Sequence, residues 1–415
     1  MRSLFFLLFG LAGFSCVKVF SQTLETKTTS LTSQVEALIN YGIQNSAFPG
    51  AQVLIFKKDT LRLHQAYGYH TYDSITPVSK NHLYDLASVT KVLGSTLALM
   101  KLYELYNLDL ETPVSQWIPI LKRSNKKAHN LKQILSHSAG WKPYITHQNL
   151  VYNKKGNYKW NTLSQSKSKR FPHPVSDSLF VHKRYQNKMY RRIKKTELTP
   201  LGELVYSGMF YFFVPQLVPT LSGLSFSEFL NTHFFKPMKL ERIAFLPTEK
   251  FPKSEIVPTE RDSLFRKQLV HGWVHDEAAS LMGGVSGNAG LFANTTSLAP
   301  LLHMLLQGGS YKGIQYLKPE TIALFSQRTY PEGENYRGLG FDKPTLEPGE
   351  DRYPSPLVSP ETFGHTGYTG TMVWVDPTND CFVILLTNRV YPSRTQRGLY
   401  QLNIRPKLLD YAIQN

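Results

Sequence analysis

Two pairs of strand-like segments, one pair near each end of the chain, constrain the fold more than any other feature of the sequence. Residues 51–56 and 61–69 are short apolar runs joined by a polar turn, and residues 371–375 and 382–387 repeat this pattern. Such pairs predict β-hairpins. Helical patches and loops fill the sequence between them, so we expect an α/β fold of the α+β type. Its antiparallel sheet is built from N- and C-terminal strands and is flanked by helices.

A mostly helical subdomain is expected between these strands. The 415 residues suit one large domain or two medium ones. We assign residues 22–95 and 285–415 to the sheet-containing part and residues 96–284 to the helical subdomain. The helical subdomain includes a basic insertion at residues 142–199. Apolar periodicity further predicts three helices, at residues 33–44, 92–105 and 396–413.

Most of the positive charge of the chain lies in this insertion. The whole chain has 47 Lys and Arg against 30 Asp and Glu, a net charge of +17. Residues 151–195 hold thirteen basic residues and one acid, Asp177, a balance of +12. A polar run of like charges is typical of an exposed, solvated loop rather than of core. The alternative is a surface that binds an anionic polymer of the cell envelope.

The first 21 residues have the layout of a secretory signal peptide. Arg2 precedes an apolar run at residues 4–14 that is too short for a bilayer anchor, and Ser21 ends a sequence suited to cleavage. We therefore expect a secreted or periplasmic protein whose mature chain has no transmembrane segment and meets no nucleic acid. Lipid attachment at Cys16 is a less favoured alternative, because the preceding residues match a lipoprotein signal poorly. Cleavage leaves Cys381 as the only cysteine.

The residues that carry chemistry begin with Ser88 and Lys91. Their i, i+3 spacing places both side chains on one face of a helix, and the apolar run that follows predicts that this helix is buried. A serine hydroxyl is a weak nucleophile that needs an adjacent base, and a buried lysine with a lowered pKa can act as that base. This pattern predicts a nucleophile and its base; the alternative for Ser88 is a helix cap.

The Ser-x-x-Lys spacing occurs five times, and the surrounding sequence separates the five copies. The copy at Ser15 lies in the leader, and the copies at Ser124, Ser164 and Ser166 lie in Lys-rich polar stretches where the lysine stays hydrated. Only Lys91 begins an apolar helix that can bury it. We therefore expect Ser88 and Lys91 to be catalytic.

A glycine-rich segment at residues 364–371 precedes the third strand. Glycines allow a backbone to approach a ligand closely, while His365 and Thr366 offer a ring donor and a hydroxyl. The backbone N–H groups of Tyr368 and Ser88 would together form an oxyanion hole. The alternative for this segment is a plain turn between strands.

A tyrosine near the lysine would pass protons between the serine and the leaving group. There are two candidates in the sequence. Tyr206, followed by Ser207 and Gly208, lies in an apolar stretch, whereas Tyr185 lies in the basic insertion. We favour Tyr206, because its context predicts burial.

These motifs resemble those of the penicillin-recognising serine hydrolases, a superfamily that includes class C β-lactamases, DD-peptidases and related esterases. Its three motifs appear in the expected order and rough spacing as Ser88-Val89-Thr90-Lys91, Tyr206-Ser207-Gly208 and His365-Thr366-Gly367. Residues 135–140 and 283–292 are also similar to stretches of the group. The resemblance covers about residues 35–410.

The resemblance implies a serine hydrolase that works through a covalent acyl-enzyme, without a metal or a cofactor. Ser88 would attack an amide or ester carbonyl while Lys91 and Tyr206 transfer protons. The substrate would be a cell-wall peptide of the D-Ala-D-Ala kind or a small ester, as for DD-carboxypeptidases and carboxylesterases. Residues assigned to substrate binding are His365, Thr366, Gly367, Ser207, Gly208 and Arg389; for Arg389 the alternative is a surface ion pair.

Two positions depart from the pattern of the superfamily. Gly208 stands where an asparagine is common, so the side-chain amide that contacts an acylamino group of the substrate is missing. This weakens the case for efficient β-lactam turnover. His365 replaces the lysine of β-lactamases, whereas histidine is familiar in peptidases and esterases of the group. The alternative hypothesis is a catalytically weak protein that holds envelope polymer through residues 151–195.

His271 and His275 have a spacing that can bind zinc. Glu277 falls outside this pair, so the zinc protease motif is incomplete. We interpret the segment as structural and expect no metal.

Overall fold

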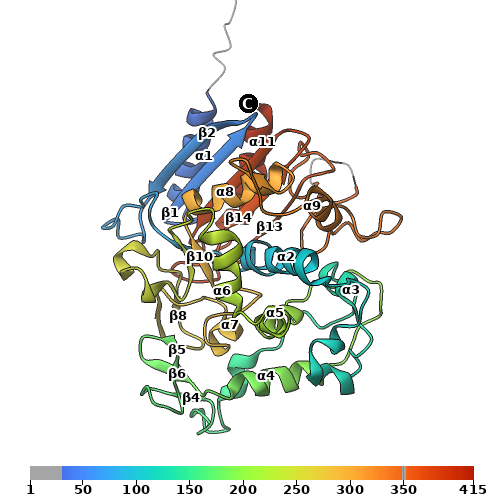
Figure 1. Ribbon diagram of the computed structural model, residues 1–415. Helices are drawn as coiled ribbons and strands as arrows, with labels where there is room; N and C mark the ends of the chain where they lie inside the picture. Colours follow the sequence, from blue (N-terminus) through green and yellow to red (C-terminus); the bar gives the residue numbers. More distant parts are fainter. Residues whose placement is uncertain (1–29, 348, 350–351) are drawn as a thin grey trace, which may run out of the picture.

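The computed structural model describes residues 30–347, 349 and 352–415, so the predicted leader and Cys16 lie outside the described residues. Its main sheet has five antiparallel strands in the order β13-β14-β15-β1-β2 (Figure 1). The strands are β1 (Gly50–Lys57), β2 (Thr60–Gly68), β13 (Phe363–Thr366), β14 (Met372–Asp376) and β15 (Cys381–Thr387). Both predicted hairpins are therefore confirmed, and they join edge to edge where β1 pairs with β15.

Helices cover both faces of this sheet, so all of β15 and all of β1 except Phe56 are buried. Val53 and Ile55 of β1 pack with α1 (Leu31–Gln44) and α11 (Ile404–Gln414). Leu54 points to the opposite face, toward the larger core that includes α8 (Thr295–Leu306). This alternation is the period of a strand with a core on each side.

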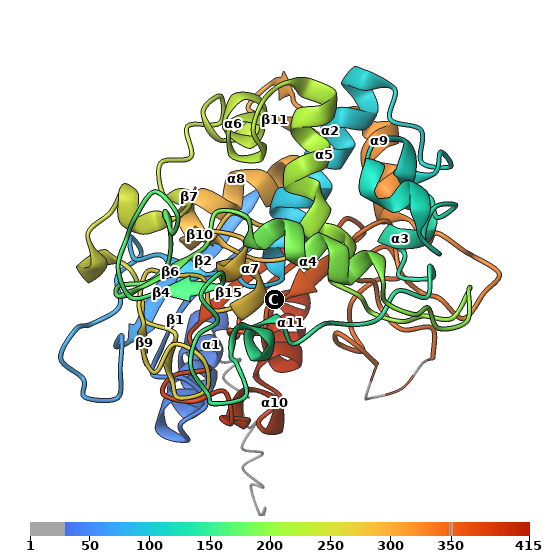
Figure 2. The same cartoon turned by 90° about the horizontal axis from the view of Figure 1, so that it is seen from below.

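The apolar run after Lys91 forms the central helix of the larger core. Lys91–Thr96 adopt the wide turns of a π-helix, and α2 (Leu97–Tyr106) continues it. Leu97, Leu99 and Leu102 are fully buried. Seen from below, α2 lies beside α5 (Val214–Ser222) and α9 (Pro319–Ser326) (Figure 2). Short π-helical stretches often occur at functional sites, and this one begins at the predicted base.

A small second sheet fixes the segment that leads to Ser88. Its order is β3-β10-β7, from β3 (Tyr84–Asp85), β10 (Leu291–Ala293) and β7 (Ile243–Phe245). The other elements are α3 (Leu131–Leu135), α6 (Phe226–Leu230), α7 (Glu277–Leu281), β8 (Glu260–Asp262), β9 (Gln268–Val270), β11 (Ser310–Tyr311), β12 (Ile314–Gln315), and short one-turn helices.

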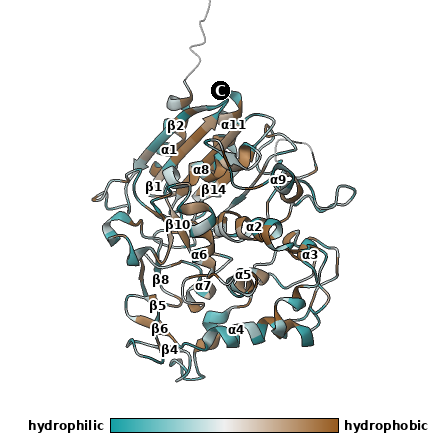
Figure 3. Ribbon diagram, viewed as in Figure 1, coloured by the Kyte–Doolittle hydropathy of each residue, from teal (hydrophilic) through white to brown (hydrophobic). Residues whose placement is uncertain are grey.

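The basic insertion is partly core, which corrects the expectation of a solvated loop. It folds into a small sheet of β4 (Leu163–Ser164), β5 (His173–Ser176) and β6 (Leu179–Val181), followed by α4 (Tyr185–Lys194). Tyr185, Met189 and Ile193 recur at helical spacing and are buried in the main core. The surrounding charges conceal this stripe in the sequence, and α4 is largely hydrophilic in Figure 3.

The single helix expected at residues 396–413 is also corrected. The structure has two helices there, α10 (Gly398–Gln401) and α11. Asn403 between them has a left-handed backbone with φ of +52°, which interrupts the helix.

Met189 provides a test of whether the insertion shares the main core. We expect Met189→Ala to lower the free energy of unfolding by about 2–5 kcal/mol, because it leaves a cavity in packed surroundings. The exposed Lys195→Ala is the matched control and should change it by less than about 0.5 kcal/mol. Denaturant titrations followed by circular dichroism measure both. Equal effects would show that α4 does not stabilise the domain.

Candidate active site

Ser88 opens into a cavity of about 480 Å³ between the C-terminal strands and the helical part of the chain. Tyr206, His365, Thr366, Gly367 and Tyr368 line this cavity with it. The structure therefore brings together one residue or more from each of the three motifs. Further lining residues are Leu204, Tyr336, Arg337, Asp342, Thr345, Tyr353, Tyr400 and Arg405.

A sharp turn between β3 and the helix presents Ser88. Ala87 has a left-handed backbone with φ of +45°, which is uncommon for a residue with a side chain. Buried Asp85 holds this turn: its carboxylate accepts the Ala87 N–H at 2.8 Å and the His275 N–H at 2.6 Å. Burial raises the pKa of the Asp85 carboxyl in spite of these donors. The sequence analysis missed Asp85, whose partner His275 lies 190 residues away.

Lys91 contacts the Ser88 hydroxyl directly. Its Nζ donates hydrogen bonds to Ser88 Oγ at 2.8 Å and to the Asn288 carbonyl at 3.2 Å. Only 3% of Lys91 is exposed, as its apolar helix predicts. The amine also lies 5.4 Å from the ring centroid of Tyr206. The serine, the lysine and the tyrosine thus form one contiguous group.

Two threonine hydroxyls attach the glycine-rich turn to the Ser88 segment. Thr369 Oγ1 donates to the Asp85 carbonyl at 2.7 Å, and Thr371 Oγ1 donates to the Leu86 carbonyl at 2.9 Å. The approach is so close that a Cβ on Gly367 would lie 2.5 Å from the Leu86 carbonyl oxygen. Glycine is therefore required at this position.

Ser88 and Tyr368 both line the cavity beside this junction. Among the described residues, neither backbone N–H donates a hydrogen bond to another protein atom. Free backbone donors facing a cavity are what an oxyanion hole needs. The pair thus remains the candidate for that role.

The structure corrects the reason for choosing Tyr206. Tyr206 is 42% exposed and lines the open cavity, whereas its rival Tyr185 is fully buried. The Tyr185 hydroxyl donates to the His147 carbonyl at 3.2 Å and accepts from Arg192 at 2.9 Å. Position beside Ser88 and Lys91, and not burial, is what distinguishes Tyr206.

The electrostatic surroundings of Tyr206 favour its phenolate. Desolvation by the surrounding protein alone would raise the pKa of the phenol. The charge of Lys91, the nearby Ser88 hydroxyl and the charge of Arg337 outweigh it, and the pKa lies below its ordinary value. Tyr206 is therefore suited to accept a proton.

His365 is buried and uncharged. Burial, followed by the charges of Arg337 and Lys91, lowers its pKa well below the ordinary value. In the neutral ring, Nδ1 must carry the proton, because it donates to the Thr366 carbonyl at 2.7 Å. Nε2 then is an acceptor. His365 does not supply the positive charge for a substrate anion.

His137, in the stretch similar to the superfamily at residues 135–140, supports the tyrosine motif. Its Nδ1 accepts the Ser207 N–H at 3.2 Å, and its ring centroid lies 4.7 Å from that of Tyr206. Burial and the charges of Arg337 and Lys91 lower the pKa of His137 well below the ordinary value. A neutral imidazole thus packs against the Tyr206 ring.

Ser207 and Gly208 were both assigned to substrate binding, but their places differ. Ser207 is buried and its hydroxyl donates to the Lys142 carbonyl at 2.6 Å, which fixes the loop. A Cβ on Gly208 would lie 3.9 Å from Lys91 Cε and 4.0 Å from Asn288 Cβ. Gly208 therefore leaves open space directly beside the lysine.

Arg337 is a cavity residue that the sequence analysis missed. It forms an ion pair with Asp342, and its Nε and Nη2 atoms are buried without a partner among the described residues. The guanidinium lies 5.5 Å from the centroid of the Tyr206 ring. The only feature of the sequence that could have drawn attention to Arg337 is its place as the one basic residue in the apolar and glycine-rich segment 336–342.

Arg389, which was assigned to substrate binding, does not line the cavity. It is 0% exposed, so the alternative of a surface ion pair is wrong. Its guanidinium packs 4.5 Å from the Tyr368 ring centroid, and its Nη1 donates to the Gln396 carbonyl at 2.8 Å. Arg389 therefore supports Tyr368 from within the protein.

The two histidines considered for zinc bind different partners. His271 Nε2 lies 2.7 Å from the Ile256 carbonyl, and His275 Nε2 lies 2.8 Å from Glu260 Oε2. Within the described part of the chain, no group of three or more His, Cys, Asp or Glu is arranged to hold a metal. The segment has a structural role, because Glu260 also binds Arg394.

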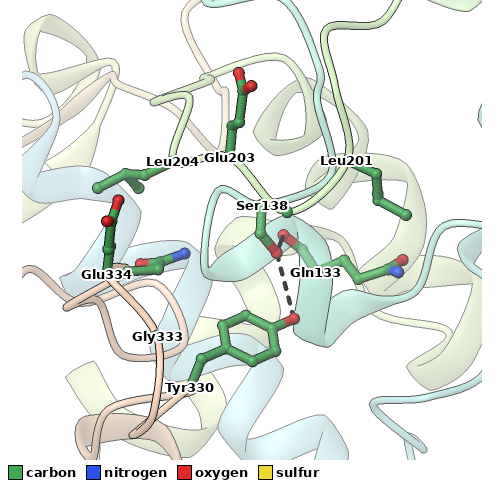
Figure 4. Close-up of a pocket in the computed structure, with 10 residues that line it drawn as sticks. Gln133, Ser138, Leu201, Glu203, Leu204, Tyr330, Gly333 and Glu334 are labelled. Atoms are coloured by element: carbon green, nitrogen blue, oxygen red, sulfur yellow. Dashed lines mark hydrogen bonds between the residues drawn. The ribbon is translucent and has the colours of Figure 1, made fainter.

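A second, larger cavity of about 940 Å³ adjoins the first, since Leu204 lines both (Figure 4). Ser138 and Tyr330 lie within hydrogen-bond distance there, at 3.3 Å. Glu203 and Glu334 carry carboxylates on its lining. The Ser138 hydroxyl donates to the Gln133 carbonyl at 3.2 Å, and its other partners among the described residues are the hydroxyls of Ser136 and Tyr330.

A serine bonded to a buried lysine, beside a tyrosine and two free backbone N–H groups, defines a serine hydrolase. Residues 35–404 match the family model described as Beta-lactamase, and the chain belongs to this family. The resemblance to the penicillin-recognising serine hydrolases is thereby confirmed.

Known proteins similar to this chain agree with that placement. A Salmonella heidelberg (strain SL476) protein named "Putative D-alanyl-D-alanine carboxypeptidase" is 30% identical over 92% of this chain and 89% of its own. The structure of a penicillin-binding protein homolog from Caulobacter crescentus matches with a TM-score of 0.65 and 16% identity, over 93% and 98% of the chains. A D-amino acid amidase from Ochrobactrum anthropi SV3 matches with a TM-score of 0.64 and 14% identity, over 93% and 99%.

The charge of Arg337 can be tested through the pH dependence of a neutral ester substrate. Removing a positive charge disfavours the phenolate, so Arg337→Gln raises the pKa of Tyr206. We expect the limb on which kcat/KM rises with pH to move to higher pH. Arg337→Lys, which keeps the charge, should leave it nearly in place. Superimposable profiles for wild type and Arg337→Gln would contradict this.

Proposed function

We propose that this serine hydrolase removes the last residue of peptides that end in a free carboxylate, of the D-Ala-D-Ala kind, in the cell envelope. The observation that carries the proposal is the 2.8 Å contact between Ser88 Oγ and the buried Lys91 amine, in a cavity lined by Arg337. The contact holds the nucleophile beside a cation that stabilises the phenolate of Tyr206, the group that takes the serine proton, and the arginine offers nitrogen donors for the carboxylate.

The reaction follows from the positions of these groups. Ser88 Oγ attacks the scissile carbonyl carbon and its proton passes to Tyr206, whose phenolate is stabilised by Lys91. The carbonyl oxygen becomes an oxyanion held by the N–H groups of Ser88 and Tyr368. When the C–N bond breaks, Tyr206 returns the proton to the leaving amine, and the acyl group stays on Ser88 as an ester. Water then attacks this ester by the reverse proton path and frees Ser88.

The carboxylate of the substrate is assigned to Arg337 and Thr366. Arg337 and Thr366 line the same cavity; Arg337 pairs with Asp342, and its Nε and Nη2 are buried without a partner among the described residues. Bidentate pairing with a carboxylate is what a guanidinium provides best. The neutral His365 ring would instead accept a hydrogen bond from an uncharged donor of the substrate through its Nε2. Arg337 therefore replaces both His365 and Arg389 in this role.

The names of the similar proteins support this substrate class. One is named a carboxypeptidase for D-alanyl-D-alanine and another is an amidase for D-amino acids. The predicted leader at residues 1–21 supports a secreted or periplasmic location. Among the described residues, the structure has no helix with the length and hydrophobicity to span a membrane.

Gly208 supports a second candidate, a carboxylesterase. Gly208 itself offers no side-chain amide beside Lys91 to recognise a peptide bond, although a Cβ there would meet only ordinary contacts. An ester needs no such recognition and has a better leaving group. The released group, amine or alcohol, distinguishes the two reactions.

Ser88→Ala tests the mechanism. The wild type should gain the mass of an acyl group after brief exposure to D-Ala-D-Ala peptides, β-lactams or p-nitrophenyl esters, measured on the intact protein. Ser88→Ala should gain none and should lose hydrolysis by about 10³-fold or more. Ser124→Ala, in a hydrated copy of the same Ser-x-x-Lys pattern, is the matched control. If the wild type is never acylated and cleaves neither peptide nor ester, the proposed function is wrong.

Gly208→Asn tests the missing amide. The positions around Gly208 leave ordinary contact distances for a Cβ, and its φ is not positive, so the variant should fold. We expect faster acylation by benzylpenicillin, whose acylamino group gains a partner, and little change with a p-nitrophenyl ester. Gly208→Ala, which fills space without an amide, is the control. An equal effect of both variants would contradict the explanation.

A further inference from the structure

A groove on the basic insertion lies outside the hydrolase site. Its volume is about 620 Å³, and residues of α4 and of the segments at 160–170 and 182–184 line it. Six of the lining side chains are cations: Lys169, Arg170, Lys183, Arg184, Lys188 and Arg191. The lining contains no Asp or Glu.

Helix geometry directs half of these cations into the groove. Lys188 and Arg191 lie three residues apart on one face of α4, and Arg184 is the N-cap residue that precedes this helix. The opposite face carries Tyr185 and Met189, which are buried in the core. The packing of the helix thus holds the three charges on a fixed surface.

The six cations lack carboxylate partners. None of them takes part in an ion pair within the described ranges of the chain. Asp177, the only acid of residues 151–195, is bound instead to Lys253 and to Trp273 Nε1. Lys188 Nζ donates to the backbone carbonyl of Asn161 at 3.0 Å, which leaves its charge uncompensated.

The concentration of charge has an electrostatic cost. Desolvation, followed by the charges of Arg170, Lys188, Arg184 and Lys183, lowers the pKa of His182 in the same lining. A multivalent anion in the groove would remove this repulsion. The chemistry of the groove therefore suits a ligand with several negative charges.

An aromatic ring accompanies the cations. Trp160 is 74% exposed and lines the groove, and the Arg170 guanidinium lies 4.5 Å from its ring centroid. An exposed indole offers a flat apolar surface on which a sugar ring can pack, while the guanidinium beside it can pair with a phosphate.

We propose that this groove binds a phosphorylated polysaccharide of the cell envelope. The cations pair with its phosphates and Trp160 contacts a sugar ring. The predicted secretory leader favours such a polymer over nucleic acid, which has the same charge. The inference does not depend on hydrolysis at Ser88, because the groove and the catalytic cavity have no lining residue in common.

The test compares two triple variants of the full chain that carry the same change of charge. Arg184→Gln/Lys188→Gln/Arg191→Gln removes the cations of the α4 face. Lys154→Gln/Lys155→Gln/Lys167→Gln removes three cations of the same insertion that do not line the groove. Binding to immobilised lipopolysaccharide is measured as a function of salt, with dephosphorylated lipopolysaccharide and single-stranded DNA as the other probes.

We expect the groove variant to bind lipopolysaccharide at least tenfold more weakly. The slope of its log binding constant against log salt concentration should be smaller, by the amount expected for the loss of about three ionic contacts. The other triple variant should lose less than threefold, and Trp160→Ala should bind at least threefold more weakly. Ester hydrolysis should be unchanged in all three variants, which also shows that they fold. Equal losses in the two triple variants, undiminished binding of dephosphorylated polymer, or tighter binding of single-stranded DNA would each overturn the proposal.

Discussion

Two hydroxyl hydrogen bonds, from Thr369 and Thr371 to the carbonyls of Asp85 and Leu86, hold the catalytic arrangement together. They attach the turn between β13 and β14 to the backbone that leads into Ser88. Arg405 closes the other side of the turn, since its Nη2 donates to the Gly367 and Thr371 carbonyls at 2.8 Å each. Because these bonds are buried, losing one leaves an unsatisfied polar group and costs about 1–3 kcal/mol. The oxyanion donors keep their places through this junction.

Local patterns were sufficient to predict the strands of the main sheet and the contact between Ser88 and Lys91. The hairpins follow from apolar runs around turns, and Lys91 follows from an i, i+3 spacing at the start of an apolar helix. Both depend on neighbours in sequence. The same reasoning selected Tyr206 from a local context that suggested burial, and the residue is exposed to the cavity instead.

Residues whose roles depend on distant partners could not be predicted in this way. Arg337 meets Tyr206 across 131 positions of the chain, and Asp85 meets His275 across 190. Arg389 was assigned to substrate binding because it follows the last strand, near the motifs. Its side chain instead points into the protein, where it packs against Tyr368. The stripe of buried residues in α4 was hidden because charged neighbours dominate its composition. Local sequence patterns therefore do not predict which distant residues meet or in which direction a side chain points.

The pairing of β1 with β15 has a consequence for how the site is assembled. β15, at residues 381–387, lies between β1 and β14 in the sheet. The N-terminal hairpin is therefore hydrogen-bonded to the C-terminal hairpin only through this strand. A chain still in synthesis, or one cut before residue 381, holds Ser88 and Lys91 but lacks the strand that aligns the turn against them. Such non-local closure is a late event in folding. The position of the glycine-rich turn against Ser88 therefore depends on a strand that comes far later in the chain than the serine.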